Sequence, residues 1–255
     1  KLKNLCAQKS VGKKINIFDK RIKKNLPKIS KISSVKWENI DILFLSLPNG
    51  EAQKLINKLF YKHQNLRFID LSADFRLKNI NQYKNYYKKK HKAKKLIKES
   101  IYSITEFKKK ELKQFRIIAN PGCYPTSIQI PLIPLLKKRL IKLKNIIIDS
   151  KSGYSGAGKN FKKKFPHKNI LSSIHAYGIL KHRHTSEIDQ EFSKYSRFKT
   201  NYVFTPNLIP TFRGMLSSIY VKLNKKVTIK KIHLELKKYH KNNFFIKVLP
   251  LNKDL

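Results

Sequence analysis

A cysteine on a predicted tight turn is the residue of this chain best suited to do chemistry. Cys123 lies in the stretch Asn120-Pro121-Gly122-Cys123-Tyr124-Pro125-Thr126-Ser127. The apolar run 115–119 predicts a buried strand before the turn, and the apolar residues of 128–136 predict a helix after it, capped by Thr126 or Ser127. This arrangement would place the sulfur at the open end of a sheet, where the helix dipole favours a thiolate. We therefore predict a nucleophile at Cys123, with an inert buried cysteine as the alternative.

A glycine-rich stretch is the second candidate. Residues 152–159 contain Gly153, Gly156 and Gly158 together with Ser152, Ser155 and a final Lys159. They follow a predicted strand at 145–150. Small residues allow close backbone approach and leave N–H groups free to face an anion, so the stretch predicts a cofactor or phosphate loop. Its spacing is not that of a P-loop or of a dinucleotide fingerprint, and a flexible turn is the alternative.

Two histidines form the third candidate. His182 and His184 lie in His182-Arg183-His184-Thr185-Ser186-Glu187-Ile188. A histidine near Cys123 could act as general acid and base, oriented by a carboxylate such as Glu187. The alternative is a polar helix start capped by Thr185 or Ser186. A metal site is not predicted, because no third ligand recurs at a suitable spacing.

The arginines are few, and two of them are candidates for binding an anionic group. The chain has 58 basic residues and a net charge of +43, yet only Arg76, Arg213 and six others are arginine. We predict that Arg76 and Arg213 clamp a carboxylate or phosphate, with structural ion pairs as the alternative. The lysines are scattered among Ile and Asn, as A/T-rich codons would produce. No specific nucleic-acid partner is therefore predicted, although nonspecific adhesion to polyanions is.

The elements that must position these residues suggest two domains. Apolar runs at 40–47, 67–72 and 115–119 alternate with a helical pattern at 51–61, which predicts a doubly wound parallel sheet with ligands at the C-terminal ends of its strands. Partly alternating strands at 145–150, 202–205 and 216–223 and a helix at 229–240 predict an α+β domain. We place the boundary between residues 121 and 122, giving an α/β, Rossmann-like domain 1–121 and a catalytic domain 122–255. Cys123 would then lie in the cleft between them.

The remaining features indicate the setting. Two distant cysteines give no disulfide framework, and Cys6, which has no comparable turn, is predicted to be a core residue. No apolar run approaches the about 18 residues that span a bilayer, and no signal peptide is visible. We expect a cytoplasmic protein without a membrane partner. The first residue, Lys1, and the apolar segment just before Leu255 suggest a fragment.

Six segments, in order along the chain, resemble N-acetyl-gamma-glutamyl-phosphate reductase, a family of the semialdehyde dehydrogenase group. They are Leu47-Pro48-Asn49-Gly50, Asp70-Leu71-Ser72-Ala73-Asp74-Phe75-Arg76, Asn120-Pro121-Gly122-Cys123-Tyr124-Pro125-Thr126, Ser152-Gly153-Tyr154-Ser155-Gly156-Ala157-Gly158, His182-Arg183-His184-Thr185-Ser186-Glu187-Ile188 and Pro206-Asn207-Leu208-Ile209-Pro210-Thr211-Phe212-Arg213-Gly214. The resemblance covers nearly the whole chain, and the cysteine segment is its most specific part.

The resemblance implies NADPH-dependent reduction of an acyl phosphate in arginine biosynthesis. Cys123 would expel inorganic phosphate and form a thioester, and hydride transfer would release N-acetyl-glutamate semialdehyde. His184 is implied as the acid–base residue, with His182 as the runner-up. The implied NADP(H)-binding residues are Pro48, Asn49, Ser152, Gly153, Ser155, Gly156 and Gly158, and the implied substrate-binding residues are Arg76, Asn120, His182 and Arg213. The family also implies a homo-oligomer, either a dimer or a tetramer.

The sequence departs from the family in two places. The glycine-rich fingerprint that opens the family is absent, and the family continues beyond residue 255. We therefore expect that the chain lacks both ends of the family's sequence. An aspartate-semialdehyde dehydrogenase with the same cysteine chemistry is one alternative, and an inactive, Lys-rich polyanion-binding fragment is another.

Overall fold

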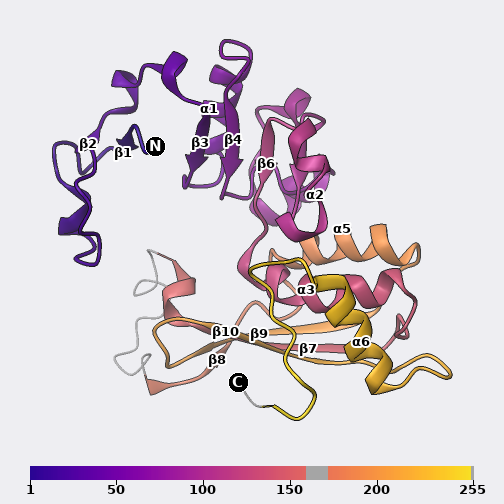
Figure 1. The fold of residues 1–255 in the computed structure, drawn as a ribbon. Helices are drawn as coiled ribbons and strands as arrows, with labels where there is room; N and C mark the ends of the chain where they lie inside the picture. Colours follow the sequence, from indigo (N-terminus) through magenta and orange to yellow (C-terminus); the bar gives the residue numbers. More distant parts are fainter. Residues whose placement is uncertain (159–171, 254–255) are drawn as a thin grey trace.

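The computed structural model describes residues 1–158 and 172–253 (Figure 1), so Lys159 of the predicted glycine loop lies outside the described residues. Two four-stranded sheets organise the described chain, one in each half. No helix within the two described ranges is long and apolar enough to cross a membrane.

The first sheet is entirely parallel. Its order is β3 (Ile42–Leu45), β4 (Arg67–Asp70), β6 (Ile117–Ala119) and β5 (Ser100–Tyr102). Helix α1 (Glu51–Phe60) follows β3 and turns Ala52, Ile56 and Leu59 into the core, the spacing expected for one helix face. Helix α2 (Ile80–Tyr87) lies in the segment between β4 and β5. The observed strands lie within the predicted runs but are shorter, and β5 was not predicted.

The second sheet is mixed. Its order is β10 (Met215–Tyr220), β7 (Ile146–Gly153), β9 (Tyr202–Ile209) and β8 (His175–Ala176). β7 and β9 are parallel, whereas β10 and β8 run antiparallel to their neighbours. Helices α3 (Cys123–Lys137), α5 (Thr185–Ser196) and α6 (Ile229–His240) pack on it around one apolar core. A parallel sheet joined to an α+β half confirms the predicted fold class.

Helix α3 begins earlier than the sequence suggested. Gly122 is its N-cap and Cys123 its first residue, so the prediction of a cap at Thr126 or Ser127 is wrong. Pro125 falls in the first turn, where a missing N–H costs nothing, and the segment can therefore be helical. The hydroxyls of Thr126 and Ser127 instead donate to the carbonyls of Gly122 and Tyr124 inside that turn.

The N-terminal segment forms a separate small pair of strands. β1 (Leu5–Cys6) and β2 (Ile29–Ser30) are parallel to each other and do not join the first sheet. Cys6 is exposed, so its prediction as a core residue is wrong. Short 3₁₀ turns complete the described structure at Ile15–Ile17, Ile32–Ser34, Trp37–Asn39, Lys94–Ile97, Thr105–Phe107, Glu111–Gln114 and Tyr154–Ala157 (η7).

Candidate active site

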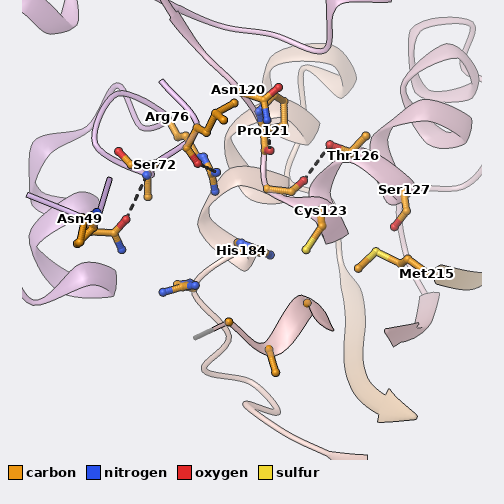
Figure 2. A pocket seen from close by; sticks show the side chains of 18 of the residues that line it. Asn49, Ser72, Arg76, Asn120, Pro121, Cys123, Thr126, Ser127, His184 and Met215 are labelled. Atoms are coloured by element: carbon orange, nitrogen blue, oxygen red, sulfur yellow. Dashed lines mark hydrogen bonds between the residues drawn. The ribbon is translucent and has the colours of Figure 1, made fainter. Parts of the chain in front are cut away.

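A cavity of about 990 Å³ lies between the two halves, and Cys123 opens onto it. It is lined by Leu47, Pro48, Asn49, Leu71, Ser72, Ala73, Arg76, Asn120, Pro121, Gly122, Cys123, Thr126, Ser127, Gly156, Ala157, Gly158, Arg183, His184 and Met215. Figure 2 shows Cys123 and His184 in the middle of this site, between Asn49 and Ser72 on one side and Ser127 and Met215 on the other. The site therefore draws on both halves of the chain.

The structure brings together most of the predicted site residues. Those that line the cavity are Pro48, Asn49, Arg76, Asn120, Cys123, Gly156, Gly158 and His184, whereas Ser152, Gly153, Ser155, His182 and Arg213 do not line it. Thr126, Ser127, Arg183 and Met215 also line the cavity and were not predicted as site residues. Of these four, only Arg183 is directly next to predicted site residues, His182 and His184.

Cys123 is held between a strand end and a helix start. β6 ends at Ala119, and the N–H of Asn120 donates to the carbonyl of Asp70 at 2.8 Å, which anchors the turn to the end of β4. The turn then reaches α3, whose first residue is Cys123. The thiol therefore lies at the positive end of a helix, with the N–H groups of Tyr124 and Cys123 directed at the sulfur.

The surroundings of the sulfur do not favour the thiolate on balance. Burial raises the pKa of the Cys123 thiol and is the largest effect on it, with the charge of Glu187 acting in the same direction. The N–H groups of Tyr124 and Cys123 and the charge of Arg76 lower this pKa but do not offset burial. The expectation of a thiolate-favouring cleft is therefore wrong for the protein alone, because surrounding atoms displace water around the sulfur. A base is needed to take the thiol proton.

Glu187 connects the elements around the cysteine. It is fully buried, and its Oε2 accepts from the N–H of Gly122 at 2.9 Å. Its Oε1 accepts from Nη1 of Arg76 at 3.0 Å. The side chain of Gln129 on α3 donates to the backbone carbonyl of Glu187 at 3.3 Å. The sequence suggested Glu187 as a partner for a histidine, but its contacts with Gly122 and Arg76 join residues too far apart in the chain for a pattern to reveal.

His184 is a buried, neutral base in reach of the cavity. Burial lowers its pKa well below the ordinary value, and the charges of His182, Arg76 and Arg183 act in the same direction. Its Nε2 lies 3.8 Å from Oε1 of Glu187, but a neutral imidazole makes no ion pair there. Its Nδ1 has no hydrogen-bond partner among the described residues.

His182 lies behind His184. The two rings are 4.8 Å apart between centroids, and His182 also contacts the rings of Tyr124, Tyr177 and Phe204. Its Nδ1 accepts from the N–H of His184 at 3.2 Å. Because His182 does not line the cavity, the geometry favours His184 for contact with a reacting group.

The backbone of the glycine loop is hydrogen-bonded to the turn after β9. The N–H groups of Gly153, Tyr154 and Ser155 donate to the carbonyls of Gly214, Thr211 and Phe212 at 2.9, 2.9 and 3.0 Å. The expectation that the N–H groups of this loop stay free for an anion is therefore wrong for these three residues. Gly153 is required by this contact, since an added Cβ would come within 2.9 Å of backbone atoms of Thr211 and Arg213. Among the loop residues that the structure describes, only Gly156, Ala157 and Gly158 line the cavity.

The predicted substrate arginines differ in their placement. Nη1 and Nη2 of Arg76 are occupied by Glu187 and the carbonyl of Leu71, while its Nε is buried without a hydrogen-bond partner among the described residues. Arg213 is exposed, and its guanidinium lies over the ring of Phe212. Asn120 lines the cavity, and its side chain donates to the carbonyl of Pro121.

Two family descriptions match the chain almost from end to end. "Semialdehyde dehydrogenase, NAD binding domain" matches residues 1–115, and "Semialdehyde dehydrogenase, dimerisation domain" matches residues 123–254. Among solved structures, aspartate semialdehyde dehydrogenase II from Vibrio cholerae superposes with a TM-score of 0.64 over 92% of this chain and 70% of that chain, at 15% identity. An aspartate semialdehyde dehydrogenase with NADP from Candida albicans superposes with a TM-score of 0.59 over 94% and 69%, at 14% identity. These likenesses show a shared fold.

Relatives of higher identity carry a narrower name. The N-acetyl-gamma-glutamyl-phosphate reductase of Brachyspira hyodysenteriae is 43% identical over 98% of this chain and 73% of its own length. That of Afipia carboxidovorans is 39% identical over 98% and 72%. The chain spans 60% of the length of a chloroplastic relative from Oryza sativa subsp. japonica that is 42% identical over 98% of this chain. On these matches, the chain belongs to the semialdehyde dehydrogenase family, in the group of the N-acetyl-gamma-glutamyl-phosphate reductases.

Proposed function

We propose that the chain carries the catalytic centre of a reductase that converts N-acetyl-glutamyl 5-phosphate to N-acetyl-glutamate 5-semialdehyde with NADPH, in arginine biosynthesis. The observation that carries the proposal is that Cys123, at the first residue of α3, opens onto the same cavity as the buried, neutral His184. The names of the relatives support the choice of substrate. A division between residues 121 and 122 is supported by the separate sheets and apolar cores of the two halves.

The cavity suits a nicotinamide cofactor beside the cysteine. The segments 47–49 and 71–73 follow β3 and β4, so they lie at the C-terminal ends of parallel strands, where doubly wound sheets bind nucleotides. Gly156 and Gly158 line the opposite half of the cavity. Pro48 and Asn49 would hold the nicotinamide end against the site, and the bound cofactor would supply the hydride.

The residues present can carry both halves of the reaction. His184 takes the thiol proton, and Sγ of Cys123 attacks the acyl carbon; the carbon–oxygen bond to phosphate breaks, and inorganic phosphate leaves with that proton. A thioester on Cys123 remains. After hydride reaches the thioester carbon, the oxyanion collapses, the carbon–sulfur bond breaks and the aldehyde leaves. The released thiolate regains a proton from water through His184. The N–H groups of Cys123 and Tyr124, which lower the pKa of the thiol, would stabilise the thiolate before the attack and after the aldehyde leaves.

The first half of this reaction can be tested without the cofactor. Acetyl phosphate, a simple acyl phosphate, should acetylate the wild-type protein on Cys123 and release inorganic phosphate, which peptide mass spectrometry and a phosphate assay would detect. Cys123→Ser should show no thioester. Acetylation at the same level in the serine variant would overturn the assignment of the nucleophile.

The complete reaction is best measured in reverse. Oxidation of N-acetyl-glutamate 5-semialdehyde should require both NADP⁺ and phosphate, and Cys123→Ser should abolish it. Oxidation of aspartate semialdehyde at a higher kcat/KM would favour the alternative dehydrogenase instead. A wild type that neither forms the thioester nor turns over would overturn the proposed function.

We also propose that the chain forms a homo-oligomer through the open face of the second sheet. Figure 1 shows α3 and α5 on one side of this sheet. On the other face, Ile147 pairs in register with Val203 and Tyr220, and these three are 49%, 49% and 61% exposed. An exposed apolar row of this kind is typical of a protein interface, and the family description of this half as a dimerisation domain supports a second copy as its partner.

The oligomer can be tested by light scattering during gel filtration. Val203→Asp places a charge in the middle of the apolar row and should shift the protein to the monomer. The control is Thr205→Asp, on the same strand face but in a polar row with Asp149 and Ser218. A wild-type monomer would contradict the proposal.

A further inference from the structure

The N-terminus of α1 is capped by a carboxylate from another part of the chain. Asp74, fully buried in the loop after β4, accepts hydrogen bonds from the N–H of Gly50 at 2.8 Å on Oδ1 and 2.9 Å on Oδ2. Its Oδ2 also accepts from the N–H of Gln53 at 3.0 Å. The hydroxyl of Tyr83 donates to Oδ1 at 2.7 Å. These donors and the positive end of the helix compensate for burying the carboxylate.

The local sequence of α1 provides no such cap itself. Its N-cap is Gly50, which has no side chain to accept a bond and which takes a φ of +92° that favours glycine. In most helices the side chain of the N-cap residue itself accepts the bond. Such a cap would stabilise α1 without connecting it to another part of the chain. The cap from Asp74 instead ties the turn at residues 48–50 to the loop after β4.

A further contact joins the same two segments, since Oδ1 of Asn49 accepts from the N–H of Ala73 at 3.3 Å. Nζ of Lys89, which follows α2, also holds the turn by donating to the carbonyl of Asn49 at 2.6 Å. Figure 2 shows the bond from Asn49 to the loop that carries Ser72. Pro48 and Asn49 form one part of the cavity wall, and residues 71–73 form the adjoining part. Asp74 therefore lies directly behind this wall and sets the spacing of its two parts.

We propose that Asp74 is a positioning residue for the nicotinamide cofactor: it fixes the turn at Pro48–Asn49 against the loop at 71–73, so that the wall of the cavity is formed before the cofactor binds. The inference rests on the proposed function. The bonds to Asp74 also mean that the N-terminus of α1 does not bind a phosphate, because the N–H groups of Gly50 and Gln53 already donate to a carboxylate. The phosphate groups of the cofactor therefore bind elsewhere, and the turn contacts its nicotinamide end.

Asp74→Asn tests the assignment with little change in shape. An amide is neutral and has one acceptor oxygen where the carboxylate has two, so the bonds from the N–H groups of Gly50 and Gln53 are weakened or one of them is lost. We expect the KM for NADP⁺ in the reverse reaction to rise roughly tenfold, as expected when one buried donor is left unpaired. The KM for N-acetyl-glutamate 5-semialdehyde and the rate of alkylation of Cys123 by iodoacetamide should change less than about twofold, since the cysteine turn is held by other residues.

Two control variants test whether the rise in KM comes from the position of the turn. One removes a nearby charge, and the other lowers stability. Glu51→Gln removes a carboxylate from the same helix end, but that side chain is exposed and bonds only Lys54, so it should leave the KM for NADP⁺ unchanged. Tyr83→Phe removes one donor to Asp74 and the acceptor for the side chain of Gln53. It leaves the bonds of Asp74 to the N–H groups of Gly50 and Gln53, so it should lower the melting temperature with a smaller effect on this KM. Equal rises of both KM values in Asp74→Asn, or an unchanged KM for NADP⁺, would overturn the inference.

Hydrogen exchange tests the positioning itself without turnover. In Asp74→Asn the amides of residues 50–53 should exchange at least about tenfold faster than in the wild type, whereas the peptide around Cys123 should not change. Unchanged exchange at 50–53 would overturn the inference even in an active enzyme. A wild type that binds no NADPH in a fluorescence titration would instead overturn the proposed function, and the cofactor role of Asp74 with it.

Discussion

Oε2 of Glu187 accepts a hydrogen bond of 2.9 Å from the backbone N–H of Gly122, the residue directly before Cys123. The other oxygen of the same carboxylate bonds Arg76 in the loop after β4. One buried side chain on α5 thus joins the cysteine turn to the first sheet. Because the turn sets the direction of the thiol, Glu187 acts on the proposed reaction as a positioning residue, with no contact to the reacting atoms required.

Removing the charge of Glu187 should destabilise the folded protein. We expect Glu187→Gln to lower the free energy of unfolding by about 3 to 5 kcal/mol, because Arg76 then stays buried without its partner charge. Urea unfolding measures this loss. In the double variant Arg76→Met/Glu187→Gln neither charge is buried, and part of the loss should be recovered. A single variant as stable as the wild type would show that the pair contributes nothing.

A side chain at Gly122 should lower activity, because it would clash with His184. The backbone conformation of Gly122 is not the reason. Its φ of −66° and ψ of 160° suit any residue. An added Cβ, however, would lie 2.6 Å from Nε2 of His184 and 2.8 Å from its Cε1, so the ring would have to move. We expect Gly122→Ala to fold and to lower kcat about a hundredfold, the effect of misplacing a reacting group by roughly 1 Å.

A double-mutant cycle checks that this loss acts through the imidazole. In a His184→Ala background the clash is absent, so adding Gly122→Ala should reduce kcat by less than about twofold further. Equal losses in the two backgrounds would mean that alanine disturbs the cysteine turn itself.

The two histidines should differ sharply in function. His184→Gln should lower kcat about 10² to 10⁴-fold, the range for removal of a general base. His182→Gln, one ring away and outside the cavity, should retain most of the activity. The pKa of His184 is well below its ordinary 6.5, so the imidazole stays neutral as the pH falls to 6.5. The acid limb of kcat/KM should therefore lie below pH 6.5. A limb at a higher pH, or a greater loss in His182→Gln, would move the base to His182.

The sequence was sufficient for the fold class and for placing Cys123 at the cavity between the two halves. Continuous apolar runs predict parallel strands such as β4, and the spacing of Ala52, Leu55, Ile56 and Leu59 predicts α1, because both patterns record which face is buried. Cys123 was found for a local reason as well, since proline and glycine force a turn between a strand and an apolar helix.

What the sequence could not show are contacts between residues far apart in the chain. The partner of Gly122 is Glu187, 65 positions later, and the cap of α1 is Asp74, 24 positions after Gly50. No periodicity marks such pairs. The start of α3 was misplaced because threonine and serine are good caps in general, whereas here Pro125 fits the first turn. The pKa of Cys123 was misjudged because desolvation depends on the whole cavity.

The buried carboxyl of Asp70 should make stability depend on pH. Its side chain is 0% exposed, its Oδ1 accepts from the N–H of Ser72 at 2.9 Å, and its Oδ2 has no hydrogen-bond partner among the described residues. Burial, aided by the charge of Asp74, raises the pKa of Asp70 to about 6 from an ordinary 3.8. The stability that this group contributes is therefore fully present below pH 3.8 and is lost as the pH rises through about 6. Holding the charge above that pH costs about 3 kcal/mol at most.

Asp70→Asn should consequently stabilise the protein at neutral pH. The amide keeps an acceptor for the N–H of Ser72 and removes the buried charge, so we expect the free energy of unfolding to rise by about 1 to 3 kcal/mol near pH 7.5 and by progressively less toward pH 5. Urea unfolding at a series of pH values measures both trends. The matched control is Asp41→Asn, an exposed aspartate just before β3, which should change stability by less than about 0.5 kcal/mol at any of these pH values. If the gain at Asp70 were the same at pH 5 and pH 7.5, it would come from packing, and the buried charge would not be its cause.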